Sequence, residues 1–217
     1  MRITRLGQRA AAVATAALVT SALGAAPASA HGKTKPLGTK SLAAVLTADK
    51  SGFDRNGHDY DVLTAAVLAV LKAKPSSKVG VLTDGKTALT AFVPNDRAFQ
   101  VLVADIQHTK RLPSEKKAFT AVAGLGINTV ESILLYHVVP GATINRKAAL
   151  KSDGAKLKTA AGSSVKVDVY GHWHKRVKLI DADRSDRDPR IVRFDINKGN
   201  RQIAHGIDRV LRPINLP

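Results

Sequence analysis

The sequence predicts an α+β protein with one domain, its helices mainly in the N-terminal half and a folded β-sheet wedge mainly in the C-terminal half. Three observations predict this class. Apolar residues recur at helical spacing in two segments before residue 110. After Gly141 apolar and polar residues alternate instead, which is typical of strands with one buried face. The chain is also long enough for a single domain with a substantial core.

Residues 1–30 are predicted to be a secretory signal peptide. The segment begins with arginines, continues with a run rich in Ala, Val and Leu, and ends in an Ala-x-Ala pattern. This order of features predicts cleavage between Ala30 and His31. We therefore expect a secreted protein, extracellular or associated with the cell wall.

Residues 31–40 are rich in Gly, Lys, Pro and Thr, which favours a flexible linker before a domain at residues 41–217. No later segment approaches ~18 consecutive apolar residues, so no transmembrane segment is expected after processing. Cysteine is absent, which excludes disulfides and any metal or redox site that depends on thiolates.

The first two predicted helices follow this linker. Ser41 is expected to cap a short helix over residues 41–48, because serine side chains accept hydrogen bonds from the first free amides of a helix. Residues 61–73 place their apolar side chains on one helical face, and Asp61 is the expected cap.

A strand and two more helices are predicted in the middle of the chain. Residues 88–93 form a strand pattern that Pro94 ends, and Asn95 is then expected to cap an amphipathic helix. Asn128 and Glu131 have the spacing of a capping box, so they are expected to open a helix that runs toward the next strand.

The C-terminal half is predicted to consist of strands. Alternation on both sides of Gly162 predicts a hairpin that places Val165, Val167 and Val169 on its buried face. Further strand patterns lie at residues 176–180, 190–196 and 201–211.

The formal net charge of +17 favours acidic partners such as anionic polymers or anionic surfaces. The basic residues are scattered along the chain, and only 4 % of residues are aromatic. Because no basic stripe is interleaved with stacking aromatics, we do not expect a dedicated nucleic-acid binder.

One stretch satisfies a phosphate-binding pattern. Residues 80–87, GVLTDGKT, fit G-x-x-x-x-G-K-[ST] at every position. A functional motif needs a strand before the glycine loop and a helix after it. Here a polar segment precedes the loop, and the β-like residues that follow are closed by Pro94. We therefore expect a surface turn at Asp84 and Gly85, not a nucleotide site.

Two acidic loops leave calcium binding open. Residues 53–61 and 181–188 each carry several carboxylates, and oxygen ligands at alternate positions can hold calcium. Arg184 and Arg187 lie within the second loop and would repel a cation. Solvated turns are the expected state of both loops, and no metal or cofactor is predicted. His172 and its neighbours up to His174 are expected to form an exposed hairpin tip.

Three stretches, in this order and near the expected spacing, carry a resemblance to a known family. They are TAFVPNDRAFQVL at residues 90–102, ILLYHVVPG at residues 133–141, and DINKGNRQIAHGIDRVLRP at residues 195–213. Together they resemble the signature segments of the fasciclin (FAS1) domain, over residues 40–217. The turn at residues 181–190 is longer and more charged than is usual in the family, and Gly206 stands where a bulkier residue is common.

The resemblance implies a secreted adhesion or binding module without catalytic residues. Its partners would be cell-surface or matrix glycans, other anionic polymers, or proteins. In animal members of the family, the Tyr-His segment has been linked to receptor binding. Carried over to this sequence, those binding residues would be Tyr136 and His137.

His137 also has a structural interpretation, which the apolar residues around it favour. We expect a fixed, hydrogen-bonded imidazole between a helix and a strand, since a buried imidazole needs a partner for each nitrogen. His205 lies between Ile203 and Ile207 in an alternating segment and is interpreted in the same way.

Two other functions remain open from the sequence. An extracellular hydrolase acting on acidic polysaccharide would need convergent carboxylates or a Ser–His contact in a pocket. A small-ligand or lipid carrier would need an apolar cavity. The sequence names neither the ligand nor the oligomeric state.

Overall fold

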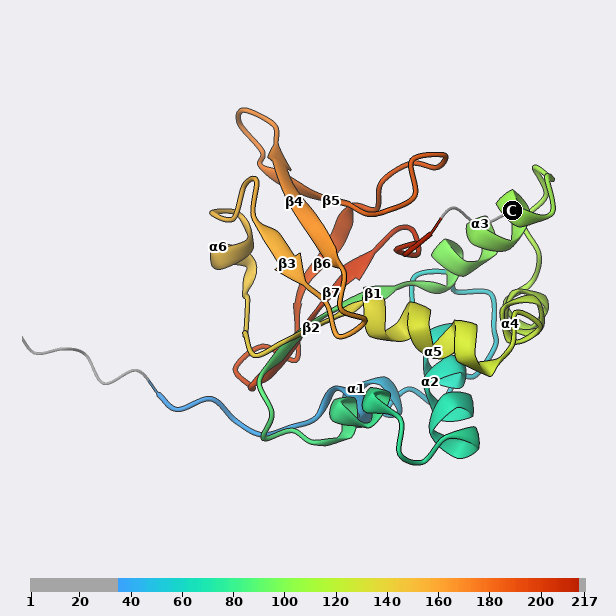
Figure 1. Cartoon of the computed structure of the whole chain (residues 1–217), viewed down its shortest axis with the longest axis horizontal. Helices are drawn as coiled ribbons and strands as arrows, with labels where there is room; N and C mark the ends of the chain where they lie inside the picture. Colours follow the sequence, from blue (N-terminus) through green and yellow to red (C-terminus); the bar gives the residue numbers. More distant parts are fainter. Residues whose placement is uncertain (1–34, 215–217) are drawn as a thin grey trace, which may run out of the picture. The chain divides into compact units, whose positions relative to one another are not determined.

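The computed structural model describes residues 35–214. The predicted signal peptide, its cleavage point and the first residues of the predicted linker lie outside this range. From Pro36 onward the chain forms one compact unit. In this unit most helices gather beside one sheet and a second sheet covers the other face of the first, which is the α+β arrangement that the sequence predicts (Figure 1).

Most helices lie in the first two thirds of the chain. They are α1 (Leu42–Leu46), α2 (Asp61–Ala73), the 3₁₀ helix η1 (Lys78–Thr83), α3 (Asp96–Ile106), α4 (Glu115–Ala123), α5 (Ile127–Tyr136) and α6 (Arg146–Ala149). No single helix among the described residues is long and apolar enough to cross a membrane. Within residues 35–214, α4 and α5 taken together would be long and apolar enough, but a bend of 108° separates them.

The strands form two sheets. Their bounds are β1 (Leu89–Pro94), β2 (Val138–Pro140), β3 (Lys156–Lys158), β4 (Ser164–Tyr170), β5 (Arg176–Ile180), β6 (Ile191–Ile196) and β7 (Gln202–Ile207). The first sheet has the order β2-β1-β7-β6, and the second is the meander β3-β4-β5. Strand β1 runs parallel to β7, although more than a hundred residues separate them in the sequence.

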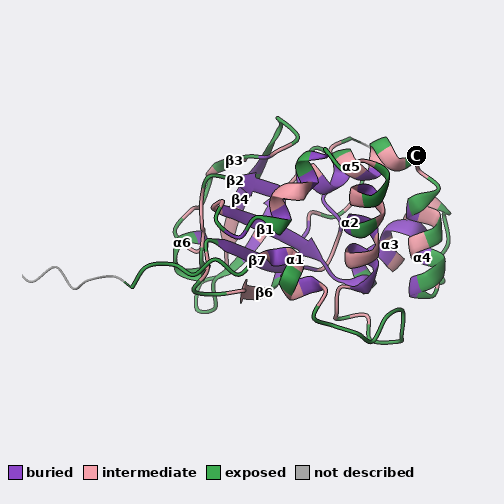
Figure 2. Ribbon diagram, turned by 90° about the horizontal axis from the view of Figure 1, so that it is seen from below, coloured by how far each residue is buried: buried purple, intermediate pink, exposed green. Residues whose placement is uncertain are grey.

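Strands β1 and β7 are buried along their whole length and divide two apolar cores (Figure 2). Because side chains alternate across a strand, Ala91 and Val93 face the helices while Phe92 faces the second sheet. Val165 and Val167 of β4 complete the core between the sheets. The predicted hairpin is therefore confirmed, with its valine face buried.

Two predicted helix caps are confirmed. The Ser41 hydroxyl accepts a hydrogen bond from the Ala44 amide at 3.2 Å, and the Asn95 side chain accepts one from the Ala98 amide at 2.9 Å. Both caps bind the amide three residues ahead, which is the geometry that makes Ser and Asn strong caps.

Two other predicted caps are wrong. Asp61 is the first residue of α2, and its amide donates to the carboxylate of Asp96 from a different helix. Helix α5 starts after Gly126, whose φ of 87° ends the preceding turn, so Asn128 and Glu131 lie inside the helix. The Glu131 carboxylate pairs with Lys74. A tertiary partner thus replaces the local cap of α2, whereas α5 begins without a side-chain cap.

The end of the predicted linker belongs to the folded unit. The Gly38 amide donates to the Gly199 carbonyl, and the Gly38 carbonyl accepts from the Arg201 amide, at 2.8 and 2.9 Å. The Lys40 carbonyl accepts from the Asn197 side chain at 2.7 Å. These bonds hold residues 38–40 against the turn between β6 and β7, whereas the flexibility of the rest of the linker stays a prediction.

Candidate functional site

The outer face of the second sheet collects positive charge. Leu157, Val165, Val167 and Leu179 face the core. The alternate residues of the same strands therefore face outward. We call this outer surface the basic sheet face, and its cationic side chains are Lys156, Lys158, Lys166, Arg176 and Lys178.

The register of the strands brings like charges together on this face. Lys156 lies directly opposite Lys166 across the β3–β4 pair. Opposed side chains on neighbouring strands lie close enough to interact, and like charges in this position destabilise a sheet. A polyanion that crosses the strands would relieve this repulsion.

Acidic side chains compensate only one cation of the basic sheet face. Lys178 forms ion pairs with Asp168 at 3.2 Å and with Asp188 at 3.4 Å. The hydrogen bond to Asp168 raises the pKa of Lys178 above its ordinary value. Within residues 35–214, Lys156, Lys158, Lys166 and Arg176 form no ion pair, so their charges are available to a partner.

The hairpin that joins β4 to β5 carries an exposed aromatic side chain at its tip. Trp173 is 89 % exposed and contacts the ring of His172, with 5.1 Å between the ring centroids. Gly171 precedes it with a φ of 94°, and a Cβ there would collide with the His174 carbonyl. The predicted exposed tip is confirmed.

The structure places His137 between α5 and the C-terminal segment. It is the C-terminal cap of α5, and its Nδ1 lies 2.8 Å from the Ile133 carbonyl. Its Nε2 accepts a hydrogen bond from the Leu211 amide at 2.9 Å. Since an amide can only donate, the imidazole carries its proton on Nδ1. Burial lowers the pKa of His137 to about 4, so the ring is neutral at physiological pH.

Tyr136 is fully buried in the core between the sheets. Burial raises its pKa to about 12, and its hydroxyl reaches the Ser164 carbonyl only at 3.4 Å. Neither the phenol nor the imidazole of His137 reaches the surface. A partner that touches this segment would meet the exposed Pro140 and Gly141 that follow it. The direct binding role implied by the resemblance stays a prediction.

His205 has the structural role that the sequence predicts. It lies fully buried in β7, where its Nε2 donates to the Ile144 carbonyl at 2.8 Å and its Nδ1 accepts from the Asp195 amide at 3.2 Å. Burial lowers its pKa. The ring therefore links β7 to β6 and to the segment before α6.

The phosphate-binding pattern lies in a 3₁₀ helix and a turn. The Asp84 carboxylate accepts the Lys86 amide at 3.1 Å and the Thr87 hydroxyl at 2.6 Å. The Asp84 carboxylate therefore already accepts the hydrogen bonds that a phosphate would need. In addition, strand β1 follows the turn where a phosphate-binding motif has a helix. The expected surface turn is confirmed.

The two acidic loops differ in their surroundings. In the second loop, Asp183 and Asp186 form ion pairs with Arg212 at 3.3 and 3.0 Å, and Asp186 also pairs with Arg209. The arginine side chains thus occupy the place that a calcium ion would need. The first loop instead brings together the carboxylates of Asp54, Asp61 at its end, and Glu115 from α4.

The described residues offer no large apolar cavity, although open pockets of about 410 to 560 Å³ lie elsewhere, and one of them is lined by Asp49, His58 and Asp59. An apolar cavity in the helical core has a volume of about 10 Å³, which is too small for a lipid. The convergent carboxylates of Asp61 and Glu115 are buried, so they cannot reach a polysaccharide chain.

Comparison with known proteins supports the resemblance found in the sequence. A sequence model of the fasciclin domain matches residues 63–213. Among solved structures, the chain is similar to a FAS1 domain pair from the insect cell adhesion molecule fasciclin I, with a TM-score of 0.53 and 19 % identity. That similarity covers 81 % of this chain and 51 % of the pair, so the chain spans about half of its length. It shows a shared fold alone. No curated protein matches the chain.

Proposed function

The chain belongs to the fasciclin-domain family, and from this membership we propose that it is a secreted, non-catalytic adhesion module that binds anionic polysaccharide at the cell surface or in the matrix. The basic sheet face is the proposed contact surface. The observation that carries the proposal is the opposed, uncompensated pair Lys156 and Lys166.

Electrostatics supports an anionic partner for this face. A lysine near an anionic surface contributes roughly 1 kcal/mol of attraction. Four uncompensated cations on one sheet would therefore give useful affinity at low salt, and salt would weaken it as the screening length falls. Trp173, at the tip of the same hairpin, offers an exposed apolar ring against which a sugar can pack. Phosphate and other small inorganic anions have no apolar face and would not contact this ring.

The experiment compares two double variants with the same loss of charge. Lys156→Gln with Lys166→Gln removes the opposed pair, while Lys116→Gln with Lys117→Gln removes two exposed lysines from α4. Binding to polygalacturonate and heparin is measured by calorimetry at several salt concentrations. We expect the first variant to bind about tenfold more weakly or worse, from ~1 kcal/mol per lysine. The second should bind like the wild type.

Two results would contradict the proposal. An equal loss of affinity in both variants would mean that net charge alone drives binding. Tighter binding to duplex DNA than to either polysaccharide at equal salt would make the surface a nucleic-acid interface. Trp173→Ala separates the contribution of sugar packing from that of charge, because it should weaken polysaccharide binding without changing the salt dependence of the binding.

Secretion is the second part of the proposal, and it rests on the features of residues 1–30. N-terminal sequencing of the protein from culture medium should give His31 as the first residue. Protein that keeps the apolar run and stays in the membrane fraction would argue for an uncleaved anchor.

A further inference from the structure

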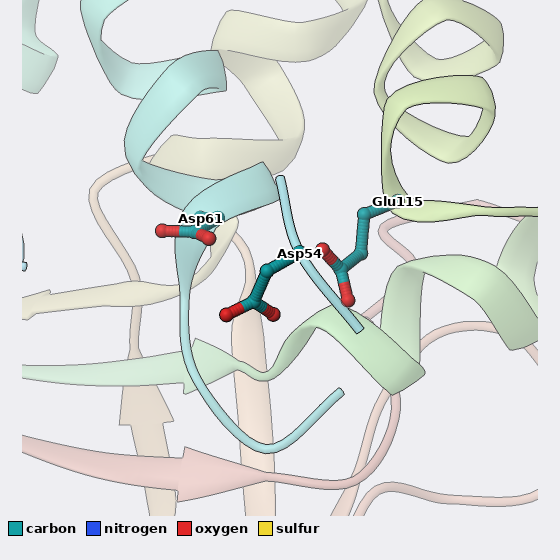
Figure 3. Close-up of side chains that lie close together, drawn as sticks. All are labelled: Asp54, Asp61 and Glu115. Carbon is teal, nitrogen blue, oxygen red and sulfur yellow. The ribbon is translucent and has the colours of Figure 1, made fainter. Parts of the chain in front are cut away.

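Three carboxylates converge where loop 50–60 meets the starts of α2 and α4. Asp54 lies on the loop, Asp61 is the first residue of α2, and Glu115 is the first residue of α4. One oxygen from each lies within 4.8 Å of the other two. Figure 3 shows Asp54 between the two helix starts, with the three carboxylate groups close together.

Both helical carboxylates are buried and carry oxygens without a hydrogen-bond partner. Glu115 is 1 % exposed, and neither of its carboxylate oxygens forms a hydrogen bond. Asp61 is 9 % exposed, and its Oδ2 also lacks a partner. Burial raises the pKa of Glu115, and the backbone amide of Asp54, which lies near this carboxylate, opposes the rise. A buried charged oxygen without a partner is costly, so such groups call for an explanation.

No basic side chain balances these charges, although the protein is strongly basic. The ion pairs of residues 35–214 include none of Asp54, Asp61 and Glu115. The nearby Asp59 adds a further buried oxygen without a partner. Asp96 has a separate role, because its two oxygens accept the amides of the first two residues of α2.

We propose that Asp54, Asp61 and Glu115 form a binding site for Ca²⁺. Calcium takes oxygen ligands at about 2.3–2.6 Å, so ligand oxygens on opposite sides of one ion lie up to roughly 5 Å apart. The spacing of the three carboxylate oxygens, within 4.8 Å, fits a shared ion. All three ligands are carboxylates, which suit a hard cation and do not favour zinc. The ion would supply the positive charge that the chain itself does not.

Burial also affects the titration of the cluster. Burial, followed by the charge of Asp59, raises the pKa of Asp61 to about 6. Burial, followed by the charge of Asp54, raises the pKa of Glu115. A bound divalent cation favours the ionised form of each group. Calcium should therefore bind more tightly as the pH rises, with release of protons.

The second acidic loop provides an internal comparison. Its carboxylates meet Arg209 and Arg212 at ion-pair distance, whereas those of the first cluster meet no cation. The exposed Asp54 gives the site an approach from solvent. Binding would join the loop to two helices whose first residues are 54 positions apart in the sequence. This inference stands independently of polysaccharide binding, because it involves no residue of the basic sheet face.

The test is calcium binding by the purified protein, measured by calorimetry and by thermal melting after treatment with a chelator. Extracellular calcium modules have dissociation constants of about 10⁻⁴ to 10⁻³ M. At roughly 10 mM calcium the folding equilibrium constant should rise about 10- to 100-fold, which corresponds to several degrees in melting temperature. Magnesium at the same concentration should shift the melting temperature less, since it gives up its water reluctantly.

Glu115→Gln keeps the shape of the side chain and removes its charge. It should weaken calcium binding at least about tenfold, because a charged ligand is lost. Without calcium it should melt no lower than the wild type, because an uncompensated buried charge has been removed. If Glu115 had only a structural role, Glu115→Gln would melt at a lower temperature than the wild type both with and without calcium. Glu131→Gln is the matched control, since Lys74 balances that carboxylate, and it should keep calcium binding.

Two outcomes overturn the proposal. One is the absence of any calcium effect on the wild type at millimolar concentration. The other is an unchanged calcium response in Glu115→Gln. Asp54→Asn keeps the test decisive if the buried variant does not fold, because Asp54 lies on an exposed loop. Wild-type affinity for calcium in Asp54→Asn would equally refute the site.

Discussion

Replacing His137 with alanine should lower the free energy of unfolding by about 3 kcal/mol, the combined effect of two lost hydrogen bonds. The buried amide of Leu211 would lose its acceptor, which costs ~1–3 kcal/mol. The Ile133 carbonyl would lose the donor that completes the last turn of α5, at about 1 kcal/mol net. For a domain of this size the melting temperature should fall by roughly 6–12 °C.

The stability that His137 contributes should depend on pH and should fall in acid. The folded pKa of His137 is about 4, below its ordinary value of 6.5, because burial disfavours the charged ring. The neutral ring therefore contributes its full stability above pH 6.5, and this contribution is lost as the pH falls through 4. Protonation would also place a donor on Nε2 against the Leu211 amide, which is itself a donor.

The assay is chemical denaturation of wild type and His137→Ala at several pH values between 4 and 7.5, with polysaccharide binding measured where both are folded. The difference in stability should be largest at neutral pH and should shrink in acid. Taking the difference removes the contribution of the buried acids, whose raised pKa values act in the opposite direction. Equal stability of the two proteins, with binding abolished in the variant, would refute the structural role and make His137 a contact residue.

Three further substitutions test other parts of the structure. Lys86→Ala should change stability by less than ~0.5 kcal/mol and should leave no nucleotide binding to lose, since the turn uses the Lys86 amide and not its side chain; micromolar ATP binding that the variant loses would contradict this. Gly206→Ala should destabilise the fold by roughly 1–3 kcal/mol, because the added methyl group meets the Tyr60 hydroxyl, and melting curves would show it. Arg212→Leu should lower the free energy of unfolding by about 3–5 kcal/mol in denaturation experiments, because it leaves buried acids without their partner. A stabilised variant would mean that the attraction within the ion pairs is smaller than the cost of removing the charges from water.

The parts of the fold that depend on short-range patterns could be predicted from the sequence. Ser41 and Asn95 cap helices three residues ahead of them, and the hairpin around Gly162 follows from alternation. Helix α4 was not predicted, since the segment before it is polar and its one buried acid, Glu115, has no local signal. The Asn128 and Glu131 pattern failed because Lys74 and Ser77 compete for the carboxylate.

The proposed sites depend on contacts that the sequence pattern does not contain. The lysines of the basic sheet face look scattered in the sequence, and only the register that opposes Lys156 to Lys166 gathers them. The alternation of β4 was the available signal, since each residue between two buried valines must face outward. The calcium cluster joins Asp54 to Glu115 across sixty-one positions, and closing such a distance depends on the packing of α2 and α4.

The burial of Tyr136 predicts how the Tyr-His segment would influence binding without touching a partner. Tyr136 lies in the same buried cluster as Val165 and Val167, and Lys166 lies between these valines on the basic sheet face. Tyr136→Ala should therefore disturb the support of β4 and lower the melting temperature, at a cost of about 3–5 kcal/mol for a large aromatic side chain. Its effect on polysaccharide affinity should disappear at temperatures where the variant is fully folded, whereas Lys166→Gln should lose affinity at every temperature.

Tyr136→Phe tests the hydroxyl alone, because it keeps the ring. The long hydrogen bond from this hydroxyl to Ser164 contributes little, so the variant should bind and melt nearly like the wild type. A Tyr136→Phe variant that is stable but does not bind would instead show that the hydroxyl contacts the partner directly.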